Sequence, residues 1–439
     1  MAILGFHVVI CLIAVTIITK LVRRANFIDV FITNGEDEAV EGFSIPKSSP
    51  FQLSLYPVNV ADLVQFEMYT QLHWMCLCIP VSLLVYTLSE IYNFVMPENK
   101  DFNVSIIFML VVIMFVLQVL MTLSSYLVSS VDERGFMISI GAVYFLFAFI
   151  FAMNSHRIFD IQMLEAYDKL STNIADFVES SGLFDNSTAN IRDYRPTNPL
   201  MMYISLSVFF SMLSAMLVFP NFRCAMMYLK ALEIDGRIRR AVDHVAFLLP
   251  AFILASFSKP LNPLNSQKPS KIEISSVTIE QLDIIRIYLL LFWVFTKFIT
   301  RVSHLQAHLN LAYDKVAEMR AESGKVKNYT IQAMIYRYYR YLCCAAIQYF
   351  GPAILALLFA LLLKTTGNLS WLGAPRGIEN AELNTLALTG PIRFVFDTTI
   401  CRAFFSFLLV VTLLINFSLQ LLGVVYHSYF VGGTGTTTN

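Results

Sequence analysis

The residues of this sequence that could do chemistry are few, and the most informative are ionisable side chains inside long apolar stretches. Glu90, Arg286 and Lys297 each lie in such a stretch. A charge inside a hydrocarbon layer is costly, so it must be paired, reach the surface or serve a function. Lys297 lies one helical turn before Arg301 and is expected to extend its ammonium group to the nearby surface.

Glu90 and Arg286 are expected to form an ion pair. If successive membrane helices alternate in direction, both residues lie in the outer leaflet, within reach of each other. An unpaired carboxylate there would neutralise, because its pKa rises when its charge is not compensated. The pair would be structural, or it would belong to an ion or proton pathway, and the sequence leaves both open.

Two histidines, His304 and His308, are four residues apart, so a helix would place both imidazoles on one face. A zinc site needs three or four ligands, and no cysteine, glutamate or third histidine stands nearby at a suitable spacing. We therefore expect surface histidines. The sequence also contains no Gly-rich phosphate loop, no nucleophile elbow and no HExxH motif. We expect no catalytic residue, no cofactor and no metal, so the protein is predicted not to be an enzyme.

The same segment carries an apolar stripe whose members are spaced by three or four residues, as on one face of a helix. They are Leu305, Leu309, Ala312, Val316 and Met319. Such a stripe is expected to pack on neighbouring cytosolic structure or to lie on the bilayer surface. The alternative is a coiled-coil seam for a partner protein.

The stretch Arg301–Trp371 shows which elements must position these residues. Its first part, 301–341, is basic, and Leu342–Leu363 then holds 22 residues without a charge. A helix needs about 20 residues to cross the hydrocarbon layer. Tyrosines alternate with arginines at the junction, as at headgroup level; this favours a membrane helix over a nucleic-acid surface. Gly351-Pro352 predicts a kink that neighbouring helices must cover, so this helix is expected to be central.

Composition leads to the same class of protein. Hydrophobic residues make up 57% of the 439 residues and charged residues 14%, against about 25% charged in soluble domains. We predict an all-α fold, a polytopic integral membrane helical bundle. The net charge of zero argues against nucleic acid as a partner. The seven cysteines are odd in number and lie mostly in or beside apolar runs, so they are expected to be packing residues.

Nine membrane spans are predicted. Residues 1–24 form the first, an uncleaved anchor that ends on Lys20, Arg23 and Arg24 in the cytosol. The other spans are Trp74–Met96, Val104–Val128, Phe136–Met153, Leu200–Pro220, Val245–Phe257, Leu282–Thr300, Leu342–Leu363 and Ala403–Tyr426. The count falls to eight if the short run Val245–Phe257 is re-entrant. Nine spans place both basic segments in the cytosol, as the positive-inside rule requires.

This topology divides the chain into domains. Residues 25–71 form a cytosolic loop, and residues 72–439 form the bundle. Within the bundle, 221–244 and 301–341 are basic cytosolic segments, and 154–198 and 365–401 are outer loops. The sequons at Asn186 and Asn368 fall in these outer loops, so both are candidate glycosylation sites.

Four blocks resemble the transmembrane protein 161 family, and the chain is similar to an invertebrate member. They are Phe219–Leu232 (FPNFRCAMMYLKAL), Ser303–Ala312 (SHLQAHLNLA), Tyr341–Trp371 with its ending LLLKTTGNLSW, and Thr87–Tyr92 (TLSEIY). The resemblance implies a multi-pass membrane protein tied to calcium and potassium currents, calcium stores, cardiac rhythm and neuronal development, with a link to oxidative-stress resistance. It implies no catalytic residues.

Two functions remain open at this point. The first is a modulator of calcium or potassium currents, or of calcium stores, in excitable cells; its partners would be ion channels or calcium pumps, besides the lipid bilayer, in the plasma membrane or endoplasmic reticulum. The second is an ion channel or transporter in its own right. The sequence lacks a filter-like loop, rings of carboxylates and paired broken helices, which favours the modulator. A chemoreceptor-like signalling protein fits the span count poorly.

Overall fold

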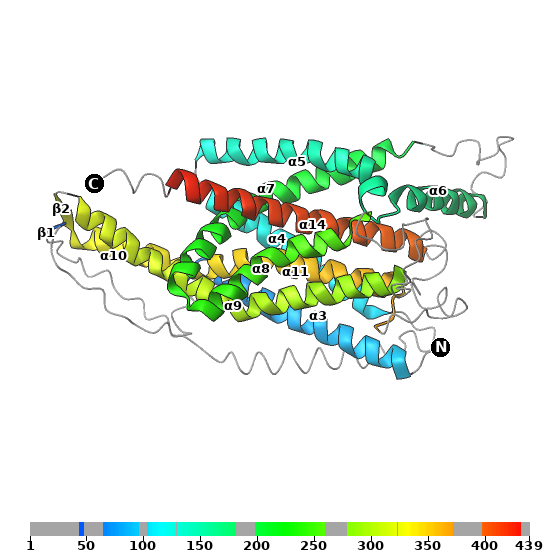
Figure 1. The fold of residues 1–439 in the computed structure, drawn as a ribbon, viewed down its shortest axis with the longest axis horizontal. Coiled ribbons are helices and arrows are strands. Elements are labelled where there is room, and N and C mark those ends of the chain that lie inside the picture. Colours follow the sequence, from blue (N-terminus) through cyan, green and yellow to red (C-terminus); the bar gives the residue numbers. More distant parts are fainter. Residues whose placement is uncertain are drawn as a thin grey trace, which may run out of the picture.

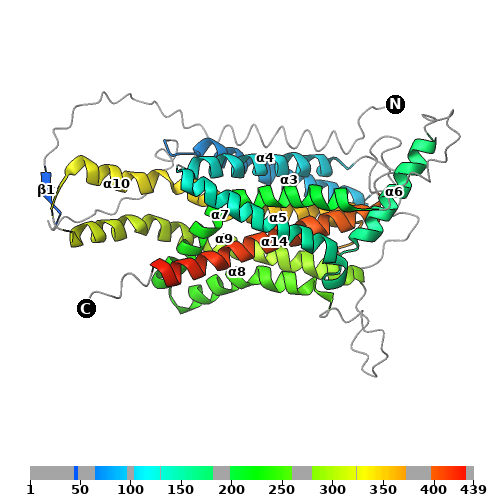
Figure 2. The ribbon, with the colours of Figure 1, turned by 90° about the horizontal axis from the view of Figure 1, so that it is seen from above.

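The computed structural model describes residues 44–47, 65–95, 103–128, 130–180, 198–259, 279–322, 324–371 and 397–431. Long helices lie side by side along one axis (Figures 1 and 2). The helices are α3 (Tyr69–Val95), α4 (Val104–Leu127), α5 (Val131–Ile158), α6 (Met163–Ser180), α7 (Leu200–Ile234), α8 (Arg237–Ser256), α9 (Ile279–Ala321), α10 (Asn328–Arg340), α11 (Leu342–Thr366), α14 (Thr398–Tyr426) and the π-helix η4 (His427–Val431). The strands are β1 (Ser44–Pro46) and β2 (Lys325–Lys327).

Six helical segments are long and apolar enough to cross a membrane. They are Tyr69–Val95, Val104–Leu127, Val131–Ile158, Leu200–Ile234, Asn328–Thr366 and Thr398–Tyr429. The fold is therefore all-α, as predicted. Helices α8 and α9 are not among the six, and both carry charged residues within their length. The predicted first span, most of the loop 25–71, Asn186 and most of the loop 365–401 lie outside the described residues.

The bundle has two ends. We call the end that carries α10 and the start of α8 the basic end, and the end that carries α6 the far end. At the basic end, Lys230 of α7 contacts Asp314 of α9. At the far end, Ser258 pairs with Phe159, so α8 runs from one end of the bundle to the other. This geometry fits a crossing segment and does not fit the re-entrant alternative for Val245–Phe257.

Helix α11 occupies the centre of the bundle, as the sequence predicts. It contacts α3, α4, α7, α9 and α14, and 94% of its apolar window is buried. Gly351 allows a close approach of α4, because a Cβ atom there would lie 2.8 Å from the Leu120 side chain. From Leu342 to Leu363 the helix carries no charge and no polar face, and a helix that is apolar all round is typically buried.

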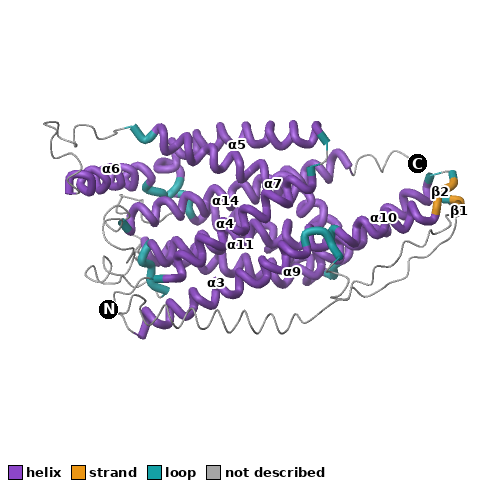
Figure 3. The backbone as a smooth tube through the Cα atoms, turned by 180° about the vertical axis from the view of Figure 1, so that it is seen from behind, coloured by secondary structure: helices purple, strands orange, loops and turns teal. Residues whose placement is uncertain are grey.

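Helix α9 extends beyond the bundle at the basic end and packs against α10 (Figures 1 and 3). We call this projection, residues 305–340 with β1, the arm. At its tip, β1 and β2 pair in antiparallel register, Ser44 opposite Lys327. Within the apolar stripe, Ala312, Val316 and Met319 are buried, while Leu305 and Leu309 are half-buried.

Candidate functional site

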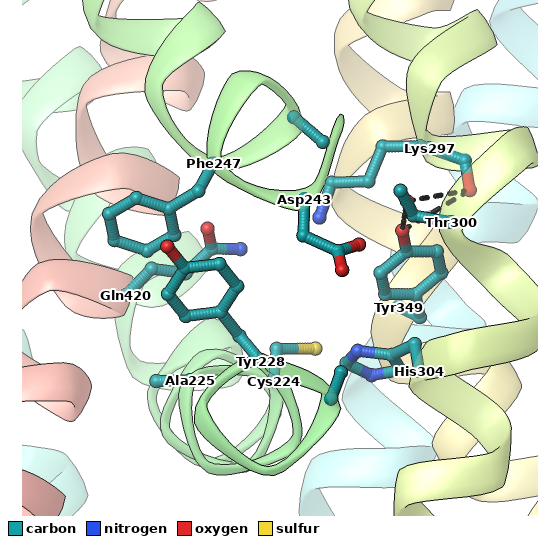
Figure 4. A pocket seen from close by; sticks show the side chains of 12 residues that line it. Cys224, Ala225, Tyr228, Asp243, Phe247, Lys297, Thr300, His304, Tyr349 and Gln420 are labelled. Carbon is teal, nitrogen blue, oxygen red and sulfur yellow. Dashed lines mark hydrogen bonds between the residues drawn. The ribbon is translucent and has the colours of Figure 1, made fainter. Parts of the chain in front are cut away.

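A small cavity lies inside the bundle near the basic end, between α7, α8, α9, α11 and α14 (Figure 4). Its volume of about 30 Å³ gives room for roughly one or two water molecules. Its polar lining residues are Cys224, Tyr228, Asp243, Lys297, Thr300, His304, Tyr349 and Gln420. A buried space with this many ionisable groups is the strongest candidate for a functional site among the described residues.

Helical periodicity brings these side chains together. Lys297, Thr300 and His304 follow one another at spacings of three and four on α9, so they share one face. Cys224 and Tyr228 do the same on α7, after Pro220. The remaining members come from three other helices, so the site exists only when five helices are assembled.

Tyr349 is the centre of the site. Its hydroxyl lies 2.6 Å from Thr300 Oγ1 and donates to the carbonyl oxygen of Lys297 at 3.2 Å. The Lys297 ammonium lies 4.3 Å from the centroid of its ring, and the His304 ring centroid lies at 4.1 Å. The aromatic face thus stabilises the ammonium by a cation–π interaction.

Lys297 does not reach the surface as we expected. Its side chain is 7% exposed and points toward the cavity. Within the described part of the chain it forms no ion pair, although Asp243 lines the same cavity. The expectation is wrong because α11 and α8 cover the face of α9 along which the side chain would extend.

Asp243 is the carboxylate of the cavity. It precedes the apolar run of α8 and is 6% exposed, and its Oδ2 atom has no hydrogen-bond partner among the described residues. Burial raises the pKa of the Asp243 carboxyl to about 7, and the neighbouring Asp235 carboxyl adds to the shift. Asp243 can therefore bind and release a proton near neutral pH.

The two histidines are buried, and the prediction of surface histidines is wrong. His304 and His308 are 6% and 7% exposed, because Tyr349 of α11 and Tyr338 of α10 cover their side of α9. His308 Nε2 donates to the carbonyl oxygen of Tyr338 at 3.0 Å. Burial lowers the pKa of both imidazoles, that of His304 well below its ordinary value with Lys297 contributing. Both rings are neutral at pH 7.

The polar region continues from the cavity into α14. Gln420 Nε2 donates to Asn221 Oδ1 at 3.2 Å and lies 3.4 Å from Asn416 Oδ1. The Nδ2 atoms of both asparagines lack partners among the described residues. Buried amides with unused donors can bind water.

The predicted Glu90–Arg286 pair is not formed. Glu90 instead accepts from Lys364 Nζ and from Trp371 Nε1, the latter at 3.2 Å. Sequence reasoning missed Lys364, although it stands at the end of the central apolar run. In an alternating topology this end lies beside the end of α3, so the position of Lys364 was a usable signal.

Arg286 also has other partners. Its guanidinium donates to Asp283 Oδ1 at 2.6 Å and to the carbonyl oxygen of Ser256 at 2.9 Å, and it forms an ion pair with Asp160 at 3.4 Å. Arg402 contacts the other oxygen of Asp283. The missed signal was spacing, because Asp283 and Arg286 are three residues apart on one helix face. We call these residues, with Glu90 and Lys364, the far-end cluster.

The two candidate glycosylation sites and possible metal ligands remain to be placed. Asn368 lies in the turn after α11 with a φ of 53° and is half-buried, and its glycosylation stays a prediction. Asn186 lies outside the described residues. In the described part of the chain, no group of three histidine, cysteine, aspartate or glutamate residues could hold a metal ion.

The similarity of this chain to known proteins extends over nearly its whole length. The sequence model of a family described as predicted transmembrane protein 161AB matches residues 2–37 and 34–431. The chain belongs to the transmembrane protein 161AB family. No solved structure matches it. Membership of the 161AB family, together with the six apolar helices, makes it an integral multi-pass membrane protein.

In this member of the 161AB family, the cavity brings one carboxylate, Asp243, together with the basic side chains of Lys297 and His304. Burial raises the pKa of the Asp243 carboxyl. Protonation of Asp243 would remove the negative charge of the cavity and would change its net charge.

Proposed function

We propose that this chain is a non-enzymatic membrane protein that modulates ion-conducting or ion-pumping partners, calcium or potassium channels or calcium pumps of excitable cells, rather than conducting ions itself. The observation that carries the proposal is an apolar layer between the cavity and the far-end cluster. A conducting protein needs polar groups along a continuous route through the bilayer.

The apolar layer is formed mainly by α9 and α11. Lys297 and Arg286 are eleven residues apart on α9, or roughly 16 Å along the axis. Between them, Ile287, Leu290 and Trp293 are at most 1% exposed. On α11 every residue from 350 to 363 is apolar. An ion in the cavity would have to lose its hydration to pass between these two helices.

The arm offers a surface for a partner. It projects from the basic end, which is the cytosolic end in our topology (Figure 3). Its apolar stripe is largely turned inward, while Tyr313, Tyr329 and Tyr336 are 42% to 48% exposed. Tyrosine is enriched where proteins bind each other. This supports a regulatory subunit whose arm contacts the cytosolic part of a channel or pump.

A channel or transporter is the second candidate, and one observation favours it. Lys297, Asp243 and His304 lie together without ion pairs, and ionisable groups inside a membrane bundle often mark an ion or proton pathway. In this alternative the bundle would open in a second conformation.

Reconstitution separates the two functions. The pure chain in liposomes should give no flux of Ca²⁺ or K⁺ above that of protein-free liposomes. Flux that depends on the protein would overturn the modulator.

A rescue experiment tests the role of the cavity. In cells depleted of the protein, Lys297→Met should fail to restore calcium and potassium currents, whereas Lys315→Met should restore them. Lys315 is a matched control because it is exposed on the same helix and pairs with Glu318. Equal rescue by both variants would show that the cavity has no part in modulation.

A further inference from the structure

An apolar groove opens on the outside of the bundle at the basic end, between α5, α7 and α14. Its volume of about 690 Å³ lies within the ~300–1,000 Å³ of ordinary ligand pockets. The apolar walls are Phe136, Ile140, Phe219, Phe222, Met226, Leu422, Val425 and Tyr426, and the polar rim is Asp132, Glu133, Arg223 and His427. The groove is separate from the cavity that contains Lys297.

The groove exists because α5 leaves its neighbours toward its first turns. Further along, Ser211 Oγ donates to the Gly141 carbonyl oxygen at 2.8 Å, and the Tyr144 and Ser418 hydroxyls are in contact. The first contact holds α5 to α7 and the second holds it to α14. Near the start of α5, by contrast, the contacts with α7 are between rings: the centroid of Phe136 lies 6.3 Å from that of Phe219 and 6.0 Å from that of Phe222.

The groove faces the surroundings of the bundle. Leu422 and Val425 are 47% and 44% exposed, and Phe136 is 43% exposed. Around an integral membrane protein these side chains meet hydrocarbon, so an acyl chain is the natural occupant of the apolar part. The rim then lies at headgroup level, near the tyrosine-rich and basic junction at the start of α11.

The rim carries charges of both signs. Arg223 is half-buried, and its guanidinium makes no hydrogen bond or ion pair among the described residues. Asp132 and Glu133 lie in the first turn of α5. An occupant therefore meets a guanidinium on the α7 side and two carboxylates on the α5 side.

We propose that this groove binds a phospholipid whose headgroup carries both a phosphate and a primary ammonium, that is, a phosphatidylethanolamine. An acyl chain lies along the aromatic wall, the phosphate contacts Arg223, and the ammonium donates to Asp132 and Glu133. Arginine suits phosphate because its planar fork donates two hydrogen bonds. An anionic lipid without an ammonium would bring a further negative charge beside the two carboxylates, and a quaternary choline headgroup has no N–H to donate.

Native mass spectrometry of the purified full chain tests this assignment, with phosphatidylethanolamine, phosphatidylcholine and phosphatidylglycerol titrated separately. Wild-type protein should retain phosphatidylethanolamine preferentially. Arg223→Gln should weaken its retention about tenfold, because a hydrogen bond to a charged group is lost. The matched control is Arg237→Gln, the same charge change at an exposed position of the same end, and it should bind like wild type.

A second variant probes the ammonium. Asp132→Asn with Glu133→Gln should remove the preference for phosphatidylethanolamine over phosphatidylglycerol while α5 stays folded. Glutamine at position 133 can still complete the capping box that Glu133 forms with Ser130. A thermal melt of each variant without lipid confirms that it is folded.

Three results would overturn the assignment. One is equal retention of the three lipids by wild-type protein, and another is tighter retention of phosphatidylglycerol, which would indicate a site for anionic lipid. The third is unchanged retention of phosphatidylethanolamine in folded Arg223→Gln. The proposal does not depend on ion modulation, since lipid binding is measured on the isolated chain.

Discussion

The far-end cluster and the cavity both bury charged side chains, but they satisfy these charges differently. At the far end, Arg286 and Lys364 are 2% and 1% exposed, and each forms an ion pair with a carboxylate. In the cavity, Lys297 is 7% exposed and contacts an aromatic ring. Asp243 keeps a carboxylate oxygen without a hydrogen-bond partner among the described residues.

This difference separates structural charges from candidate functional ones. A buried ion pair with full hydrogen bonding has one stable state, because removing either partner leaves a stranded charge. The far-end cluster thereby ties together the ends of α3, α9, α11 and α14. The cavity instead has spare volume and a carboxyl group, Asp243, whose pKa burial raises, and a change in the protonation of Asp243 is what our proposed regulation would use.

The largest expected effect is at the far end. Arg286→Gln should lower the free energy of unfolding by roughly 3 to 5 kcal/mol, because the buried Asp283 loses its i,i+3 partner and keeps Arg402, and the ion pair with Asp160 is lost as well. Thermal unfolding in detergent measures the loss. The control is Arg157→Gln, an exposed arginine at the same end of the bundle, which should change little. A loss below about 1 kcal/mol would show that the far-end cluster is not the structural clamp.

Double-mutant cycles test the partners directly. Glu90→Gln and Lys364→Gln should be coupled by about 0.5 to 3 kcal/mol, because the two side chains touch. Glu90→Gln and Arg286→Gln should be additive within roughly 0.5 kcal/mol, because they belong to different pairs. Coupling between Glu90 and Arg286, without coupling between Glu90 and Lys364, would support the pair that the sequence predicted.

Removal of the cation from the cavity should have the opposite effect on stability to removal of a cation from the far-end cluster. Lys297→Met should leave the melting temperature unchanged or raise it, because an apolar side chain of similar length removes a buried charge that has no ion-pair partner. Lys364→Met should lower it, because Glu90 then loses its cation and keeps the hydrogen bond from Trp371. If both variants lose the same stability, the contrast between the two regions is incorrect.

The cavity should also give stability a pH dependence. Asp243 has a pKa of about 7 in the folded chain, above its ordinary value of 3.8. Between these values the folded state binds more protons than the unfolded state, so stability falls as pH rises toward 7. Asp243→Asn should remove this fall. The readout is the difference in melting temperature between wild type and variant at pH 5 and pH 8.

The two buried histidines, His304 and His308, affect the pH dependence of stability in the opposite sense to Asp243, so they need their own control. Their pKa values are lowered by burial, so their contribution is lost as pH falls below the ordinary histidine value of 6.5. His304→Gln should reduce the loss of stability on the acid side and leave the Asp243 effect in place. The difference in melting temperature between wild type and Asp243→Asn should change between pH 5 and pH 8. If this difference is the same at both pH values, Asp243 is ionised in the folded chain at both of them.

The smallest expected effect on stability comes from a substitution that tests which end of the bundle faces outward. Asn186→Gln should abolish a glycosidase-sensitive gel shift, because residues 154–198 are predicted to lie outside with the far end. Asn328→Gln is the control, since Asn328 begins α10 in the arm. A shift that depends on Asn328 would reverse the assignment of the two ends.

The sequence by itself determined the class of fold and most of the helices. An uncharged run of the right length specifies a membrane helix locally, so the predicted Leu342–Leu363 corresponds to α11, Leu342–Thr366. Gly351-Pro352 indicated its central place, because an interrupted backbone needs covering neighbours. Glu90, Arg286 and Lys297 were also recognisable, since a charge in an apolar run is conspicuous without any structure. Asp243, Asp283 and Lys364, which stand at the ends of such runs, were not recognised.

Only the tertiary structure decided which of these residues meet. Glu90 and Lys364 are separated by 274 positions, and their contact depends on the rotation and axial register of two helices. The same variables turned Lys297 and His304 inward, toward a tyrosine of α11 that no local pattern connects with them. Periodicity specifies the face of a helix on which a residue lies, but the neighbour of that face is set by the packing of the whole bundle.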